Sequence, residues 1–222
     1  MANKDMGELY ETRFGFKERK KSFVFLAVLL TVALALIILF LYFFTTFTGV
    51  VVKGNSMKNT LFDGDKLFVK KIDGDEANYG DIIVVDIGKY LTSEEKEEIQ
   101  DGLIIKRLIA KEGDRVMCRA GVVSVWYKGA SSWTALDEEY AYYGVDDFYK
   151  DDYEFEEYEV GEGEIFFLGD NRSSKKSSLD SRYKEGCSHI DGLYKQTDII
   201  GLVTEWSLDN RALAELLIKG KN

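Results

Sequence analysis

Several residue types that support common enzyme chemistries are scarce in this 222-residue chain, which has one histidine, two cysteines and no proline. Because His189 is the only histidine, a Ser-His-Asp triad is excluded unless this residue lies at the site. No CxxC or His-rich pattern indicates a metal, and we expect neither metal nor cofactor. Cys118 and Cys187 could form one disulfide in an oxidising compartment, but two thiols make no disulfide framework. A hydrolase built on this chain therefore needs a base other than histidine.

Positive charge is also in short supply. The whole chain has a formal net charge of −10, whereas residues 1–22 carry a net charge of +2, which leaves −12 on the remainder. Proteins that bind nucleic acid present a basic face to the phosphates. We therefore expect no nucleic-acid partner.

A long apolar run lies near the N-terminus. From Phe23 to Phe44 there is no charged residue, and the only polar groups are Thr31 and the phenol of Tyr42. As a helix this run would measure about 33 Å, enough to span the hydrocarbon core of a bilayer. The far end is aromatic, as in an interfacial belt, with Phe40, Tyr42, Phe43, Phe44 and Phe47. The run predicts a transmembrane anchor over residues 23–49.

A cleaved signal peptide is the alternative interpretation, because Lys20 and Lys21 resemble its charged first region. However, the run exceeds the ~7–15 apolar residues of a secretory signal. The sequence TTFTGVVVKGN that follows also lacks a convincing small-x-small cleavage site. An uncleaved anchor is therefore favoured.

Basic residues are concentrated before the anchor rather than after it. Those before it are Arg13, Lys17, Arg19, Lys20 and Lys21, and those closely after it are Lys53 and Lys58. The positive-inside rule then places residues 1–22 in the cytoplasm and residues 50–222 outside it. We expect a single-pass protein of the cell membrane with an extracytoplasmic domain.

The rest of the chain is predicted to be rich in β-strands. Runs of β-branched and aromatic residues, separated by Gly- and Asp-containing turns, cover residues 66–72, 81–87, 103–110, 115–127 and 164–170. Two segments favour helix instead. They are TSEEKEEIQDG, which Thr92 or Ser93 can cap, and the C-terminal DNRALAELLIKG.

Residues 136–162 are dense in Asp, Glu, Tyr and Phe. A calcium site or a surface for a basic partner is one interpretation. We favour a solvated, poorly fixed surface excursion, because charge-rich stretches without Gly-spaced ligand positions usually only solvate.

Two residues have features of a nucleophile and a base. Ser56 lies in the loop GNSMKNTL, where Gly54 permits a tight backbone, and a serine hydroxyl needs a base within reach. On a strand, Lys106 shares a face with apolar residues. Burial of the amine among such side chains lowers a lysine pKa by several units. Taken singly, Ser56 reads as an ordinary loop serine and Lys106 as an edge-strand lysine that snorkels to water.

Three ordered motifs behind the apolar run resemble those of bacterial type I signal peptidases. Ser56-Met57-Lys58-Asn59-Thr60-Leu61 is similar to the family's S-M-x-P-T-L, and Lys106-Arg107 with Gly113-Asp114 to its K-R-x-x-x-x-x-G-D. Gly169 to Arg172 match G-D-N-R, and Ser178, Asp180, Ser181 and Arg182 match S-x-D-S-R. The resemblance extends to about Trp206. Relatives in the endoplasmic reticulum carry histidine where this chain has Lys106, which indicates the bacterial branch.

The resemblance implies a role for each matched residue. Ser56 would be the nucleophile and Lys106 the general base, with Ser178 orienting the Lys106 amine and Gly169 keeping the chain close beside it. The backbone N–H of Ser56 would bind the oxyanion, and Gly54 offers no hydroxyl to help. Structural ion pairs are expected from Arg107, Asp170, Asp180 and Arg182.

The resemblance also implies a fold and a substrate. The fold would be mainly antiparallel β, a catalytic domain with a smaller β-rich excursion over roughly residues 118–160. Substrates would be preproteins cleaved after small residues in the pattern Ala-x-Ala, with membrane lipid and the export machinery nearby. Shallow apolar pockets would be lined by Val52, Met57, Leu61, Ile104 and Ile105, for which ordinary core packing is the alternative interpretation.

The chain departs from the family pattern at two kinds of place. Asn59, Glu112 and Gly161 replace family prolines, which is expected to loosen the turns. The seven residues SSKKSSL stand where about four are usual, so Ser177 is an alternative to Ser178.

Other functions are also compatible with these motifs. They are a specialised peptidase for pilus or surface-protein maturation and a catalytically silent, membrane-anchored binding relative. A self-cleaving repressor is excluded, because a 22-residue tail is too short for a DNA-binding domain.

Overall fold

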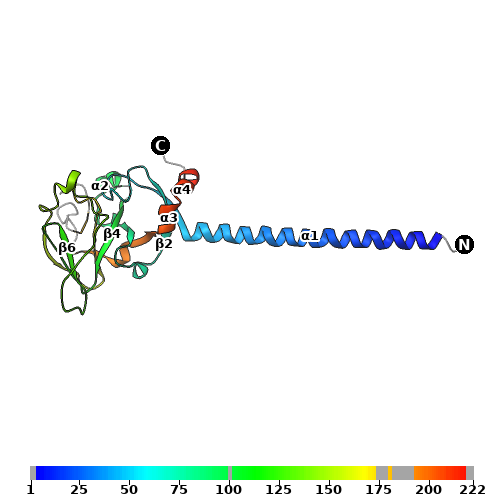
Figure 1. Cartoon of the computed structure of the whole chain (residues 1–222), viewed down its shortest axis with the longest axis horizontal. Coiled ribbons are helices and arrows are strands. Elements are labelled where there is room, and N and C mark those ends of the chain that lie inside the picture. The colour runs from blue at the N-terminus through cyan, green and yellow to red at the C-terminus, as the bar shows by residue number, and fades with distance from the viewer. Residues whose placement is uncertain (1–3, 100–101, 174–179, 182–192, 219–222) are drawn as a thin grey trace. The chain divides into compact units, whose positions relative to one another are not determined.

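The protein is described here by a computed structural model covering residues 4–99, 102–173, 180–181 and 193–218 (Figure 1). The chain forms two units, residues 1–46 and residues 47–222. Ser177, Ser178, Arg182, Cys187 and His189 lie outside the described residues. What the sequence predicts for them therefore stays a prediction.

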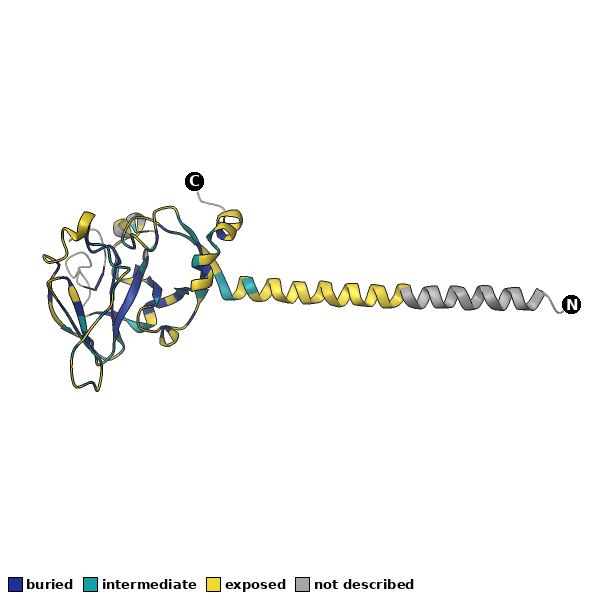
Figure 2. Ribbon diagram, in the orientation of Figure 1, coloured by how far each residue is buried: buried dark blue, intermediate teal, exposed yellow. Residues whose placement is uncertain are grey.

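The first unit contains a single helix, α1 (Lys4–Thr46). Its segment Ser22–Thr46 is long and apolar enough to cross a membrane, with a mean hydropathy of 3.2. The apolar side chains along this segment are largely exposed (Figure 2). The helix ends at Thr46, before the predicted end of the anchor at residue 49, and Phe47 begins a strand. The Phe47 ring lies 5.6 Å from the ring of Trp206, so Phe47 packs in the β domain instead of an aromatic belt.

The second unit contains a seven-stranded antiparallel sheet in the order β1-β2-β11-β3-β4-β9-β10. Its strands are β1 (Phe47–Val51), β2 (Lys66–Lys71), β3 (Ile82–Asp86), β4 (Leu103–Lys111), β9 (Glu164–Leu168), β10 (Tyr194–Lys195) and β11 (Ile199–Val203). Together with the apolar helix, this sheet confirms the predicted fold class.

A smaller antiparallel sheet, in the order β7-β6-β5-β8, follows β4 in the chain. Its strands are β5 (Arg115–Arg119), β6 (Val122–Trp126), β7 (Thr134–Ala135) and β8 (Phe155–Glu159). The predicted run 115–127 is therefore two strands rather than one. Ala120 and Gly121 form the turn between them with φ values of 47° and 72°, the left-handed pair that a tight hairpin requires.

The helices of the second unit are short. They are α2 (Ser93–Glu98), α3 (Glu205–Asp209) and α4 (Arg211–Leu217), with 3-10 turns at Gly74–Glu76, Gly88–Tyr90, Val145–Asp147 and Gln196–Asp198. The predicted C-terminal helix corresponds to α4, and the sequence did not predict α3, which is separated from α4 by the non-helical backbone of Asn210 (φ −108°, ψ 31°). Thr204 caps α3 by accepting a hydrogen bond from the Ser207 N–H.

Strand β4 is central to the core because its side chains enter three apolar clusters. Ile104 and Leu108 pack with Ile83 and Phe167 in one cluster, whereas Ile109 joins the cluster beneath the smaller sheet. Ile105 packs against the third cluster, which contains Val52, Met57, Leu61, Leu67, Val69, Ile82, Val84 and Val203. Because successive side chains of a strand point to opposite faces, both faces of β4 are covered in its central part, and Lys106 and Arg107 are buried there as well.

Candidate active site

The predicted nucleophile lies on a tight turn that follows β1. The Leu61 N–H donates to the Met57 carbonyl (2.8 Å), and both side chains are buried in the third cluster. Gly54 has a φ of 78°, and its N–H donates to the Asp63 carboxylate (2.7 Å). Ser56 is half-buried between these two fixed points. Its position is therefore set by packing after it and by a glycine bend before it.

The turn also contains a backbone conformation that proline cannot adopt. Asn59, which stands where the family has proline, has a φ of 80°, and proline is restricted to about −65°. Asparagine tolerates this left-handed region better than most residues. The replacement therefore accompanies a different local backbone, rather than the merely loosened turn that the sequence suggested.

The predicted base is buried in the middle of the large sheet. Lys106 pairs with Ile83 of β3, and only 3% of its surface is exposed. Its Nζ lies 2.9 Å from Ser56 Oγ and 3.0 Å from the Ile105 carbonyl oxygen. The structure thus brings Ser56 and Lys106 into hydrogen-bond distance, and Lys106 does not snorkel to water.

Burial changes the protonation of this lysine. Desolvation lowers the pKa of Lys106 from 10.5 to about 8, while the carboxylates of Asp180 and Asp170 act in the opposite direction. A lysine with this pKa is neutral in a useful fraction of molecules near pH 7 to 8. A neutral amine beside a serine hydroxyl can accept its proton.

Asp170 holds the base strand to the nucleophile turn. Its carboxylate, fully buried, accepts hydrogen bonds from Arg107 Nε (2.8 Å) and Nη2 (2.6 Å). The same carboxylate accepts from Thr60 Oγ1 at 2.5 Å. Arg107 also donates to the Gly80 carbonyl at 2.7 Å. One carboxylate therefore links the neighbour of Lys106 to a residue four positions after Ser56.

The other predicted support residues lie nearby in the chain or the fold. Gly169 directly follows Leu168, which pairs with Arg107. The Gly169 carbonyl accepts a hydrogen bond from Arg172 Nε (2.7 Å). Asp180 is buried, as is Ser181, whose Oγ accepts from the Phe167 N–H (2.8 Å). The hydroxyl of Ser181 thereby fixes the segment after the SSKKSSL insertion against β9.

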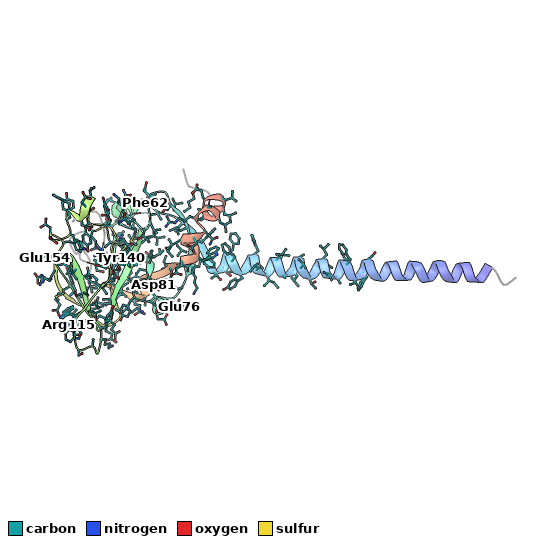
Figure 3. All side chains as sticks on the ribbon, in the orientation of Figure 1. Phe62, Glu76, Asp81, Arg115, Tyr140 and Glu154 are labelled. Carbon is teal, nitrogen blue, oxygen red and sulfur yellow. The ribbon has the colours of Figure 1, made fainter. Side chains whose placement is uncertain are left out.

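The first part of the acidic and aromatic stretch is fixed against the site, which corrects the predicted solvated excursion. Glu138 forms a buried ion pair with Arg172 (2.7 Å), and the Arg107 guanidinium stacks 3.8 Å above the Tyr140 ring, labelled in Figure 3. The Tyr142 N–H donates to the Asp170 carbonyl (2.8 Å). No local pattern signals these contacts, because the partners lie about thirty residues away in the chain.

The middle of the same stretch differs, whereas its end contains β8 and the buried side chains of Phe155 and Val160. Val145 and Phe148 are exposed, and Asp146 and Asp147 both have positive φ values. Within the described ranges, no group of three or more His, Cys, Asp or Glu side chains is arranged to hold a metal ion. Cys118 is buried, and its Sγ donates to the Tyr153 carbonyl.

The five residues predicted to line substrate pockets do not form one surface. Val52, Met57 and Leu61 are buried together in the third cluster, and half-buried Ile105 packs against it. Ile104 points into a different cluster on the other face of β4. Ile105 is therefore the most accessible of the five, and the others occupy core positions in this structure.

Comparisons with known proteins point to the same family as the sequence motifs. The family model "Signal peptidase, peptidase S26" matches residues 25–207. This match spans most of the chain, which therefore belongs to the signal peptidase family, peptidase S26, as a serine peptidase of the type I class.

Two individual similarities accompany the family match. The chain is 31% identical over 192 residues to signal peptidase I P of Bacillus subtilis subsp. natto, covering 84% of this chain and 90% of that protein. A crystal structure of a signal peptidase I from Enterococcus faecalis V583 aligns with 58% of this chain and 97% of its own, at 23% identity and a TM-score of 0.39.

Proposed function

We propose that this chain is a membrane-anchored endopeptidase that removes signal peptides from exported preproteins after the second alanine of Ala-x-Ala. Ser56 would be the nucleophile and Lys106 the general base. One observation carries the proposal: Ser56 Oγ lies 2.9 Å from the Nζ of a buried lysine, in a chain of the signal peptidase family. Ser56 and Lys106 belong to two separate sequence motifs. Their contact is therefore better explained by a shared function than by chance.

The chemistry begins with proton transfer. Neutral Lys106 removes the proton of Ser56 as Oγ attacks the carbonyl carbon of the scissile peptide. The tetrahedral oxyanion is bound by the backbone N–H of Ser56. The Lys106 ammonium then returns the proton to the leaving amine, and the C–N bond breaks. Water, deprotonated by the same amine, hydrolyses the acyl-enzyme and releases the signal peptide.

Burial of Lys106 supports its role both as the acceptor of the Ser56 proton and as the donor of that proton to the leaving amine. At a pKa of about 8, the neutral amine is available to accept a proton and its ammonium form is acidic enough to return it. Ser178 would orient the amine, and Asp180 with Arg182 would hold the supporting loop. These roles follow from the family motifs.

Anchoring explains why the substrate meets this site. The apolar segment Ser22–Thr46 would span the cell membrane, with Arg13, Lys17 and their basic neighbours in the cytoplasm. Ser56 follows the end of that segment by ten residues, so it can reach preproteins that emerge at the outer surface. Membrane lipid and the export machinery are then neighbours of the enzyme.

Small residues in the substrate would face the side of the site at Ile105. Its half-buried side chain packs against the cluster that contains the buried Val52 and Met57, and together they would form an apolar wall. Alanine fits against such a wall, while a larger side chain must displace core residues. Ile104 and Leu61 would act indirectly, by fixing this wall.

A cleavage assay tests the proposal. A preprotein with an Ala-x-Ala site is incubated with the full chain in liposomes, and the new N-terminus is sequenced. We expect wild type to cut after the second alanine and Ser56→Ala and Lys106→Ala to lose detectable cleavage. Matched controls are Ser124→Ala on β6 and Lys71→Ala at the exposed end of β2, which lie outside the site. Cleavage by Lys106→Ala, or an inert wild type, would contradict the proposal.

A further inference from the structure

The Asn55–Ser56 peptide bond carries the amide proposed to bind the oxyanion. The N–H of Ser56 and the carbonyl of Asn55 belong to the same planar unit, and the chain has no cis peptide bond among its described residues. In a trans peptide these two groups point in opposite directions. Whatever holds the Asn55 carbonyl therefore also aims the Ser56 N–H.

Asn171 holds that carbonyl. Its side-chain Nδ2 donates to the Asn55 carbonyl oxygen at 2.9 Å, and its backbone N–H donates to the Ser56 carbonyl oxygen, also at 2.9 Å. The carbonyls on both sides of the Ser56 Cα are thus bound by one residue. Asn171 is itself 7% exposed, so water competes little for these bonds.

The orientation of the Asn171 amide is fixed by its other end. Oδ1 accepts hydrogen bonds from the Ser173 N–H (3.1 Å) and the Ser173 hydroxyl (2.6 Å). Because a backbone N–H can only donate, the atom facing Ser173 must be the amide oxygen. The NH₂ group must then face Asn55, as the hydrogen bond to its carbonyl requires.

Asn171 is also held by its neighbours in the chain. The Tyr142 N–H donates to the Asp170 carbonyl (2.8 Å), and the Arg172 N–H donates to the Tyr142 carbonyl (2.6 Å). These bonds bracket Asn171 and attach it to the acidic and aromatic stretch. The residue therefore has little freedom to follow the nucleophile turn if that turn shifts.

The Ser56 N–H remains available for a substrate. Within the described part of the chain it donates to no acceptor, whereas the N–H groups of Lys58, Thr60 and Leu61 in the same turn all do. A hydrogen bond to the Asn55 carbonyl also polarises the peptide, which strengthens its N–H as a donor.

We propose that Asn171 is a positioning residue that aims the Ser56 N–H at the oxyanion by holding the Asn55 carbonyl from the opposite side. This inference rests on the proposed function, since it concerns the same nucleophile. It acts through the backbone of Ser56 and leaves Lys106 untouched. Loss of the Asn171 amide is therefore expected to lower kcat without changing KM or the apparent pKa of the base.

Two variants and one matched control test this role. Asn171→Asp has the same shape but lacks the NH₂ donor, and Asn171→Ala removes the whole amide. Asn210→Asp is the control, because Asn210 Nδ2 also donates to a backbone carbonyl, that of Trp206 (2.7 Å), at the exposed end of α3. Thermal melting of each variant identifies any that fails to fold.

The first readout uses no preprotein. A fluorophosphonate reacts with Ser56 when Oγ attacks phosphorus, fluoride leaves and Lys106 takes the proton, and this step also places negative charge near the Ser56 N–H. We expect Asn171→Asp and Asn171→Ala to label about 10- to 100-fold more slowly than wild type, as small misplacements at active sites commonly do. Asn210→Asp should label at the wild-type rate.

The second readout is preprotein cleavage at several pH values. For Asn171→Ala, which adds no charge beside Lys106, we expect kcat to fall by about the same factor, with KM and the midpoint of the pH profile unchanged. Wild-type-like labelling by folded Asn171→Asp would overturn the positioning role. So would a fall caused by KM or by a shifted midpoint.

Failure of the proposed function gives a different result. If wild type labels at Ser56 but cleaves no preprotein, and the Asn171 variants label slowly, the positioning role stands and the proposed substrate is wrong. If wild-type enzyme neither labels at Ser56 nor cleaves preprotein, both proposals are overturned.

Discussion

The two halves of the proposed dyad are held by different kinds of structure. Lys106 lies inside β4, where the backbone ladders to β3 and β9 fix it. Ser56 lies on a turn outside any strand, and its backbone is bound by Asn171, a residue more than one hundred positions later. Lys106 is thus placed by the sheet, and Ser56 is placed by a second loop.

This difference assigns a separate task to each kind of structure. The sheet buries the lysine among apolar side chains, and the burial lowers its pKa. The loop following β9 supplies directional hydrogen bonds, which set angles that burial alone cannot set. Asp170 joins the two tasks because it binds both Arg107 on β4 and Thr60 on the turn.

The largest expected effect is the loss of cleavage when the buried lysine is replaced by a cation that cannot act as a base. Lys106→Arg keeps a positive charge on β4 but cannot be deprotonated, so we expect preprotein cleavage to fall by about 10²- to 10⁴-fold, the usual contribution of a general base. Lys71→Arg at the exposed end of β2 is the control. The measurement is the cleavage rate of the purified full chain. An active Lys106→Arg enzyme would show that lysine is not the base.

The next effect breaks the link between strand and turn. Asp170→Asn leaves the buried Arg107 guanidinium without its carboxylate, and we expect the free energy of unfolding to fall by about 3–5 kcal/mol. Urea unfolding measures this loss. Glu112→Gln, which weakens an exposed pair with Lys128, is the contrast and should change the free energy of unfolding far less, because exposed ion pairs contribute little. Equal losses in the two variants would contradict the structural role given to Asp170.

A third effect concerns pH and the buried lysine. Cleavage at low substrate concentration should rise about tenfold for each pH unit below about 8, where the neutral amine is the minor form, and level off above it. Lys106→Met should abolish this cleavage at every pH. A profile that goes on rising about tenfold per unit from pH 8 to pH 10 would count against the buried base, because an exposed lysine keeps its ordinary pKa of about 10.4.

The lowered pKa of Lys106 also makes the free energy of unfolding increase with pH. Between about pH 8 and pH 10.5 the unfolded chain binds the lysine proton and the folded chain does not, so folded wild type gains stability as pH rises. Below pH 8 the cost of the buried ammonium is fully present. Relative to Lys106→Met, wild type should gain about 3 kcal/mol across this window. Denaturant titrations at pH 7 and pH 11 measure the difference.

The smallest expected effect tests the turn itself. Asn59→Pro forces φ from 80° toward the proline value, so we expect a loss of stability of about 1–3 kcal/mol and slower cleavage. Asn59→Gly, which accepts positive φ freely, should be neutral within about 0.5 kcal/mol. Melting curves compare the two. Restored or improved stability in Asn59→Pro would mean that the turn adopts another backbone.

Much of the β domain could be predicted from the sequence, and the exceptions have physical causes. Strands β2, β3, β4 and β9 are apolar runs bounded by turn residues, and each falls where its run predicts. The first three residues of β1, 47–49, lie in the predicted anchor, because composition does not mark where a helix becomes a strand. Strand β11 was not predicted, and it contains Gly201, a residue disfavoured in strands that is needed here because a Cβ would approach Val69 Cγ1 to 2.4 Å.

Some residues of the candidate site could also be predicted from the sequence, and others could not. The resemblance to the family motifs predicted Ser56, Lys106, Arg107 and Asp170 as site residues, because each stands at a matched motif position. It did not identify Tyr140 stacked on Arg107, nor the contact of Asn171 with the nucleophile turn. Aromatic and amide side chains occur throughout the chain, so their type alone carries no positional information.

By itself, the sequence determined the apolar helix, the β-rich domain and the residues of the proposed dyad. These depend on composition, periodicity and short motifs, which are properties of neighbouring positions. The tertiary structure alone decided that Lys106 is buried against Ser56, that Asp170 joins turn to strand, and that Asn171 holds the Asn55 carbonyl. Distances and desolvation arise only when segments remote in the chain pack together, and the chemistry of the site depends on both.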